Sequence, residues 1–400
     1  MATDERWTAR PLARYLATAM LVRSMDSGST VGITLLALSL PGLAHPLQVA
    51  GLLAASRTLP YILAPIIGRW LNRLTDPRPA ITAGALLFAL GVVFTVLTLG
   101  VVPLPFTMAA AATAGLAGPL LTGGLSSVLG SVADRAGRRR SGLDAITYGL
   151  GTTFSPAIVS ILAAAYSPRL AVLGLAAVGA VGSLMVFTLP LGAGVGSGRT
   201  VGFAQIFGAI VRIPGLRRTT VVSFGAMVAV TCAMLLGIAR VDAQNPARAG
   251  WVAVAMGVGA MTGNIMFTAR PPRISSDDGM TLSLVAVVPV LVIVALASGI
   301  PAQVGLFALF GFTMTPINVM SITARGEYAP PEVQGGIFVT LAGVKMGFGA
   351  IGSALAGTLA GFGYTTALLI LSGYVAVVVM VVLVDRGLTG RAVSRVSTPG

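Results

Sequence analysis

Long apolar stretches, separated by short polar, basic or proline-rich segments, recur from one end of the chain to the other. They run over about residues 12–40, 49–67, 80–100, 106–129, 144–166, 170–189, 219–239, 250–267, 280–300, 304–322, 335–359 and 366–384. A helix of about 20 apolar residues crosses a bilayer core about 30 Å thick. The pattern therefore predicts an all-α integral membrane protein with about twelve transmembrane helices.

Residues 191–218 interrupt this pattern near the middle of the chain. The glycine-rich segment 192–198 has the composition of a flexible linker, and residues 201–211 predict an amphipathic surface helix. We therefore expect an N-terminal six-helix bundle over 1–190, a cytoplasmic linker over 191–218 and a C-terminal six-helix bundle over 219–400. Segments 138–163 and 325–356 support an internal repeat, because each places a basic turn before a glycine-rich stretch at an equivalent position. Such repeats bind substrate at their interface near the midplane.

Composition agrees with a membrane protein. The chain is 55% hydrophobic and only 10% charged, against about 25% charged residues in soluble domains. Its net charge of +14 raises nucleic-acid binding as an alternative. The basic residues form no single patch, however; they gather at alternate ends of the apolar stretches, as the positive-inside rule describes. We therefore expect no nucleic-acid partner, and a multi-pass protein of the cell (cytoplasmic) membrane with both termini in the cytoplasm.

A few charged residues lie inside the apolar stretches. Asp26 lies about 20 Å along the first stretch, near the bilayer midplane, where a charge is costly and usually functional. Arg23 shares its helix face. Arg57 and Lys345 lie about 18 Å and 15 Å deep in their own stretches. Asp26, Arg23, Arg57 and Lys345 are therefore interpreted as a proton-coupling cluster; the alternative is a static ion cluster that compensates buried charge.

Polar residues in the stretch 304–322 are candidates for a substrate-binding wall. Thr313, Met314, Thr315 and Asn318 lie on both sides of a proline, and Asn264 is a further candidate in the stretch 250–267. Threonine and asparagine supply hydrogen bonds inside the membrane, and methionine makes an adaptable apolar wall. The alternative role of these polar groups is hydrogen bonding between helices.

The segment AGLLAASRTLPYILAPIIGRW, residues 50–70, resembles the second span of bacterial efflux members of the major facilitator superfamily. In that family the following loop carries a glycine, an Asp-Arg pair and further basic residues. Gly68, Asn72, Arg73 and Arg78 match this layout, with Asn72 where the family usually has aspartate. The resemblance implies two pseudo-symmetric six-helix bundles and a gating role for these four residues. In the alternative interpretation the arginines only enforce the topology.

Two other family features are incomplete. Gly151, Ser155 and Pro156 keep part of the antiporter motif of span five, while Val159 and Ser160 stand where glycines are expected. The basic residue that the family carries in span four is absent from residues 106–129. The resemblance to antiporters therefore gives export only partial support.

These features predict a secondary active transporter that works by alternating access. We expect proton-coupled export of a small amphipathic compound or drug, with a proton-coupled uptake symporter or a uniporter of a small metabolite as alternatives. The sequence has no G-x-x-x-x-G-K-[ST] motif, so the energy would come from an ion or substrate gradient. An intramembrane enzyme is a distant alternative, because His45 and Cys232 are each the single residue of their type and supply no usual catalytic or metal set. The expected partners are the substrate, protons and the lipid bilayer, for a monomer without a cofactor or a metal.

Overall fold

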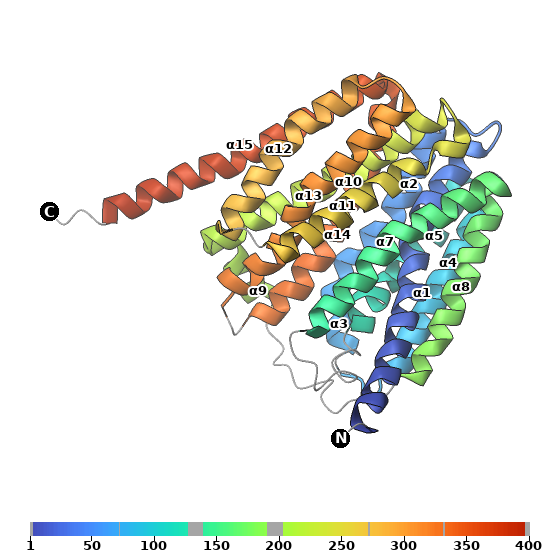
Figure 1. Ribbon diagram of the computed structural model, residues 1–400, viewed down its shortest axis with the longest axis horizontal. Coiled ribbons are helices and arrows are strands. Elements are labelled where there is room, and N and C mark those ends of the chain that lie inside the picture. The colour runs from blue at the N-terminus through green and yellow to red at the C-terminus, as the bar shows by residue number, and fades with distance from the viewer. Residues whose placement is uncertain are drawn as a thin grey trace.

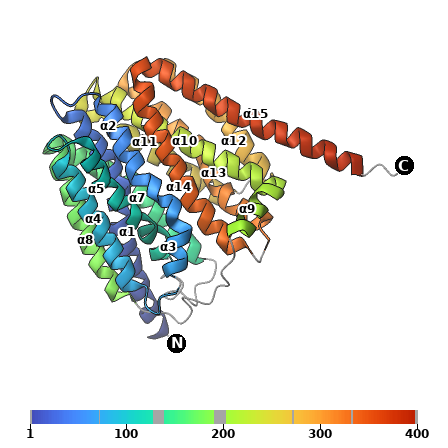
Figure 2. The same cartoon turned by 180° about the vertical axis from the view of Figure 1, so that it is seen from behind.

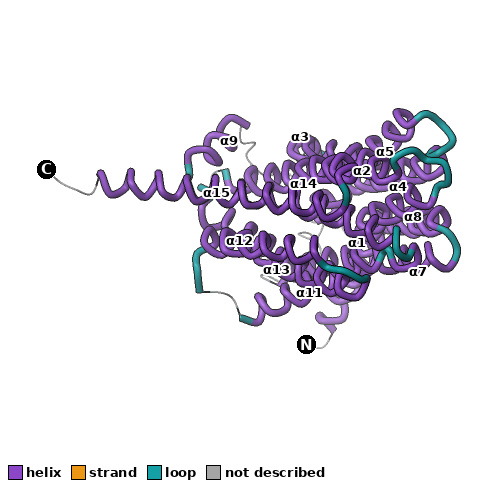
Figure 3. Tube along the Cα trace, turned by 90° about the horizontal axis from the view of Figure 1, so that it is seen from above, coloured by secondary structure: helices purple, strands orange, loops and turns teal. Residues whose placement is uncertain are grey.

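The computed structural model describes residues 3–71, 73–126, 139–189, 203–270, 273–330 and 333–396, and these ranges contain helices and loops but no strand (Figure 3). The long helices are α1 (Thr3–Ser39), α2 (Pro46–Thr58), α3 (Ala64–Leu71), α4 (Arg78–Thr98), α5 (Leu104–Pro119), α7 (Arg139–Ala165), α8 (Pro168–Met185), α9 (Phe203–Arg212), α10 (Pro214–Asp242), α11 (Trp251–Ala269), α12 (Ser276–Leu296), α13 (Ile300–Tyr328), α14 (Gln334–Leu359) and α15 (Tyr364–Val396). Short segments add η1 (Leu59–Leu63), η2 (Leu120–Gly124), η3 (Val186–Thr188), η4 (Pro246–Arg248) and η5 (Ala360–Phe362).

Ten helical segments in the described ranges are long and apolar enough to cross a membrane. Helices α1 and α7 are not among these ten, although they are 37 and 27 residues long. The surface of α4 shows why such a helix suits a bilayer. Phe88, Val92 and Val96 on one side are buried against other helices, whereas Leu90 and Phe94 are more than half exposed. An exposed row of large apolar side chains is stable only against lipid or a partner.

The helices form two groups that lie side by side (Figures 1 and 2). In the first group α1 packs on α7 and α8, and α4 packs on α5 and α8. In the second group α13 packs on α11 and α12, while α10 packs on α14 and α15. The two groups meet where α14 lies along α2, η1 and α3, and where α11 lies along α7. Helix α15 extends well beyond the other helices at its C-terminal end.

One end of the molecule is rich in arginine and is called the basic end below. It carries Arg69, Arg78, Arg217 and Arg218 near helix ends, and Arg386 within α15. An ionic network there joins three helices of the second group. Its contacts are Arg217 to Asp385 at 2.5 Å, Arg218 to Asp277 at 2.7 Å and to Asp385 at 3.5 Å, and Arg386 to Asp277 at 3.0 Å. The starts of α10 and α12 are thereby held to the last part of α15.

The predicted amphipathic helix is present as α9. Ile206 and Ile210, four residues apart, are buried in a small apolar cluster with Leu216 and Ile337. Phe207 on the other face is about half exposed, at 52%. Helix α9 therefore packs on the second group through one face only.

Two expected features differ in the structure. Span two is not one regular helix, because η1 interrupts it at Pro60, whose ring removes a backbone donor. The expected basic turn at Arg325 is wrong: α13 continues to Tyr328 and Arg325 is buried inside it, with 7% of its surface exposed. No proline follows Ile322 until Pro330, so nothing in the local sequence ends the helix earlier.

Candidate functional site

The centre of the site is an ion pair between α1 and α2. Arg57 Nη1 lies 2.9 Å from Asp26 Oδ1, and the arginine side chain is 5% exposed while the aspartate is 17% exposed. The same Nη1 also donates to the Asp26 carbonyl oxygen at 2.9 Å and to Ser29 Oγ at 2.8 Å. The other terminal nitrogen donates to the Thr30 hydroxyl. Arg57 therefore has neutral acceptors as well as the carboxylate.

Tyr61 completes the surroundings of the carboxylate. Its hydroxyl donates to Asp26 Oδ2 at 3.2 Å, so each carboxylate oxygen has a different donor. Tyr61 is 2% exposed and lies in η1. Phe88 of α4 covers the Arg57 guanidinium, with 5.7 Å between the carbon of that group and the ring centroid. Cation–π attraction of this kind is stronger when water is excluded.

Two glycines of α5 make this arrangement fit. A Cβ on Gly115 would fall on the Arg57 carbonyl, and a Cβ on Gly118 would fall within the ring of Tyr61. Only glycine allows the backbones of two helices to approach so closely. The glycines that the sequence shows in span four thus position both side chains that hold Asp26.

Arg23 is not part of this ion pair, although it is on the same helix as Asp26. Its Nη2 donates to Ser126 Oγ at 2.7 Å, and its Nη1 donates to the Thr147 hydroxyl on α7. It is buried, with 2% of its surface exposed. Arg23 therefore joins α1 to α7 and to Ser126 just after η2, and Arg57 is the cation that pairs with Asp26.

Lys345 lies on α14 in the second group. Its Nζ donates to Asn318 Oδ1 on α13 at 2.6 Å. Lys345 is half-buried and Asn318 is exposed. The four charged residues expected in one cluster are thus divided between the two groups of helices, and Lys345 contacts a candidate substrate-binding residue.

The other residues of the predicted substrate-binding wall differ in burial and in hydrogen-bond partners. Thr315 is buried and donates to the Ala260 carbonyl on α11 at 3.1 Å, which is a hydrogen bond between helices. Met314 lies in the apolar core at 3% exposure, and Thr313 is half-buried and donates to the Phe310 carbonyl at 2.8 Å. Asn264 is exposed on α11. Asn318 and Asn264 are therefore the candidates with accessible side chains.

The first of the predicted gating residues lies next to the second group of helices. Gly68 in α3 lies against Val339 of α14, and Arg73 is exposed. Arg78 pairs with Asp76 at 2.9 Å and donates to the Leu189 carbonyl after η3 at 2.9 Å. This arginine holds the pKa of Asp76 below its usual value, chiefly through their side-chain hydrogen bond. Asn72 lies outside the described residues.

Glycines also shape the contact between the two groups. A Cβ on Gly343 of α14 would lie 2.8 Å from the Tyr61 carbonyl oxygen and 2.5 Å from the Ala64 Cβ. Towards the opposite end, a Cβ on Gly51 of α2 would fall on the Ser353 carbonyl of α14. Sequence reasoning missed Tyr61 and Gly343. Tyr61 could have been found, because it follows Arg57 by four residues, which is the spacing of one helix face.

No family model and no curated protein matches the sequence. Solved structures do match. A mutant of the nucleoside transporter NupG has a TM-score of 0.74 at 13% identity, covering 94% of this chain and 99% of its own. The POT family transporter PepTSo has a TM-score of 0.72 at 12% identity, with 94% and 97% covered. A bacterial homologue of the human lysosomal transporter Spinster, inward-facing and unoccupied, has a TM-score of 0.66 at 12% identity, with 94% and 95% covered.

The chain has the major facilitator fold. The two groups of helices are the two bundles of this fold. The Asp26–Arg57–Tyr61 site lies in the first bundle, beside the contact with α14. Asp26 is partly exposed, whereas Arg57 and Tyr61 are buried. The arrangement gives each oxygen of the Asp26 carboxylate its own donor and leaves the carboxylate partly exposed.

Proposed function

We propose that this protein is a secondary active transporter that moves a small molecule across the cytoplasmic membrane by alternating access, coupled to protons. The observation that carries this proposal is the buried Arg57 held on the partly exposed Asp26 at 2.9 Å, inside a major facilitator fold. A carboxylate inside a membrane protein is costly and marks ion or proton pathways. The solved neighbours are transporters of nucleosides and peptides, which supports transport over an intramembrane enzyme.

Asp26 can take up a proton without disrupting its surroundings. When the carboxylate is neutral, Arg57 keeps the Asp26 carbonyl and the hydroxyls of Ser29 and Thr30 as acceptors. The cation is therefore held in place through a cycle of protonation. A proton and the guanidinium compete for the same carboxylate, so a change in the Arg57 or Tyr61 contact changes proton affinity.

The contact with α14 connects this chemistry to alternating access. Tyr61 touches Asp26 through its hydroxyl and approaches Gly343 of α14 through its carbonyl. Rocking of the second bundle against the first moves α14 along α2 and η1. The two orientations of the bundles then hold Tyr61 differently and differ in proton affinity at Asp26, which is the differential binding that coupling requires.

Export of a small amphipathic compound is the direction that we propose, with both termini in the cytoplasm. The basic end, with Arg69, Arg217 and Arg386, then faces the cytoplasm as the positive-inside rule requires. Uptake by proton symport is the second candidate. It uses the same site, but the proton and the substrate are bound and released in a different order. Resemblance of span two to efflux members favours export.

The test uses purified full-length protein. Compounds that raise its melting temperature are found first, because a ligand stabilises the state that it binds. Each is then added to proteoliposomes that contain a pH-sensitive dye. The parent should move protons when the compound is added, and Asp26→Asn should move none while it still exchanges the compound downhill. Asp26→Glu should keep part of the proton movement. Proton movement by Asp26→Asn at the parent's rate would place the coupling site elsewhere.

A further inference from the structure

Helices α13 and α14 run antiparallel and carry two cations on adjacent levels. Lys345 lies opposite Asn318, and Arg325 lies opposite Phe338. Seven residues separate the two levels on each helix, which is about 10 Å at 1.5 Å per residue. Both cations thus lie on one helix pair, with Arg325 nearer the basic end.

Neither cation has a carboxylate partner among the described residues. Lys345 donates to the neutral amide of Asn318 at 2.6 Å. Arg325 donates to Ser321 Oγ at 3.1 Å and to the Phe338 carbonyl at 3.5 Å, and lies over the Phe338 ring at 5.9 Å. Arg57, by contrast, has Asp26. Arg325 is buried and Lys345 is half-buried, and a cation withdrawn from water without an opposite charge is costly; an anion bound nearby offsets that cost.

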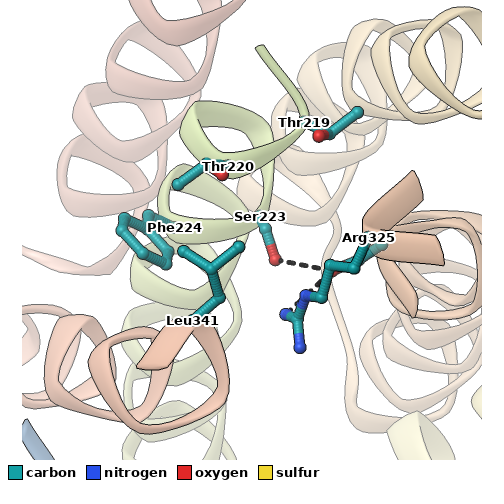
Figure 4. A pocket seen from close by; sticks show the side chains of 7 residues that line it. Thr219, Thr220, Ser223, Phe224, Arg325 and Leu341 are labelled. Atoms are coloured by element: carbon teal, nitrogen blue, oxygen red, sulfur yellow. Dashed lines mark hydrogen bonds between the residues drawn. The ribbon is translucent and has the colours of Figure 1, made fainter. Parts of the chain in front are cut away.

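The surroundings of Arg325 are polar as well as buried. Figure 4 shows the Arg325 side chain near Ser223 of α10, in a pocket that Thr219 and Thr220 of α10 also line. Ser223 and Ser321 are hydrogen-bonded to each other at 3.2 Å. Arg325 also repels Lys345 electrostatically. The second bundle therefore contains a positive region that begins near the basic end and reaches Lys345.

Lys345 lies on α14, the helix of the second bundle that packs along the first bundle. Gly343 and Gly347 face Tyr61, Ala64 and Ile62 of the first bundle, and Lys345, two residues from each, projects from a different face of α14 towards Asn318. Asn318 is exposed and Lys345 only half-buried, so a ligand can reach both side chains. Substrates of repeat-built transporters bind near the midplane at the interface of the repeats, to which α14 contributes.

We propose that Lys345 and Asn318, with Arg325 two turns nearer the basic end, bind the carboxylate or phosphate of an organic anion that this protein transports. This inference rests on the proposed transport function and narrows its substrate class. The Lys345 ammonium pairs with the anion, and the Asn318 amide donates a hydrogen bond to it after its oxygen releases the lysine. Arg325 attracts the anion towards Lys345 without contacting it.

The test follows the melting of purified full-length protein with a maleimide dye that reacts with Cys232. This residue is the single cysteine and is buried, so it reports unfolding. Small soluble carboxylates and phosphates are compared, at millimolar concentration, with the neutral amide, ester or alcohol of each. Phosphatidylglycerol is a separate arm, because a lipid headgroup offers the same phosphate chemistry.

At least one soluble anion should raise the melting temperature of the parent by several degrees, and its neutral counterpart should not. The apparent affinity should fall at least tenfold in Lys345→Met and much less in Lys345→Arg. Asn318→Asp should itself melt at higher temperature, because it places a carboxylate on Lys345, and should no longer respond to the anion. Thr262→Asp, which adds the same charge at an exposed position of α11 outside the proposed site, should gain nothing.

Failure of every soluble anion to stabilise the parent, or equal stabilisation of parent and Lys345→Met, would overturn the proposal. Stabilisation by phosphatidylglycerol alone would overturn the assignment of the site to substrate. A neutral compound that drives equal proton movement in parent and Lys345→Met would remove the anion site and leave the transport function standing. Absence of Asp26-dependent proton movement, with anion binding intact, would overturn the proposed function and leave the anion site standing.

Discussion

Tyr61 and Gly343 lie against each other across the contact between the two bundles. The tyrosine hydroxyl donates to Asp26 at 3.2 Å, and the tyrosine carbonyl would lie 2.8 Å from a Cβ on Gly343. One residue therefore contacts both the proposed proton site and α14 of the other bundle. This relationship makes the coupling between proton and movement open to direct tests.

Tyr61→Phe should keep the ring, and its fit against Gly118, while removing the hydrogen bond to Asp26. A hydrogen bond to a charged group contributes about 1.5–3 kcal/mol, so proton-driven transport should slow about tenfold or more. Compound binding should change little. The rates are measured in proteoliposomes, with Tyr166→Phe, which is 76% exposed, as the control. Equal losses of binding and transport would show that Tyr61 only supports the fold.

Gly343→Ala should disfavour the arrangement described above. The added methyl group would meet the Tyr61 carbonyl and the Ala64 side chain closer than van der Waals contact allows. Hydrogen exchange in α2 and α14 should rise, and transport should slow. Gly347→Ala is the matched control, because its methyl group would lie 3.7 Å from Ile62, an ordinary contact. Identical behaviour of the two variants would argue against a tight contact at Gly343.

Substitution of the predicted gating residues should slow transport more than it weakens binding. Gly68→Leu would press on Val339 of α14, and Arg73→Ala removes an exposed charge at the basic end. Neither residue contacts the Asp26 site in the structure. Exchange rates and ligand-induced melting shifts are measured on the same preparations, with Arg248→Ala at the opposite end as control. A parallel decline of both quantities would indicate misfolding or a direct substrate contact.

Asp385→Asn should weaken the ionic network of the second bundle. Asp385 accepts from both Arg217 and Arg218, so one substitution removes two charged contacts. The side chains of these pairs are 15–32% exposed. A surface pair contributes about 1 kcal/mol or less, and we expect a melting temperature a few degrees lower, with ligand affinity unchanged. The loss should be smaller at high salt, because salt screens exposed charges. A salt-independent loss would point to packing instead.

The orientation in the membrane can be tested with single cysteines in a Cys232→Ser background. A cysteine at Ser197, which lies outside the described residues, should not react with an impermeant thiol reagent in intact cells. One at Ala247, which is exposed at the opposite end, should react. The reverse labelling pattern would place the basic end outside the cell.

Local sequence determined the elements of this protein. The apolar stretches predicted membrane-spanning helices, and these form because a bilayer offers no other partner for backbone groups. Of about twelve expected spans, ten are found in the described ranges as apolar helices of sufficient length, and the fold is that of the resembling family. The positions of Asp26 and Arg57 along their helices could also be read from the chain, since rise per residue is fixed in a helix. Their depth in the membrane stays a prediction.

Only the tertiary structure decided which charges meet. Arg23 shares a helix with Asp26, yet it bonds to Thr147 and Ser126, while Arg57 reaches Asp26 from α2. Depth along each helix is a local quantity, but the rotation and approach of neighbouring helices depend on packing at positions such as Gly115 and Gly118. The burial of Arg325 and the contact between Tyr61 and Gly343 have the same origin, because both arise only where helices distant in sequence pack together.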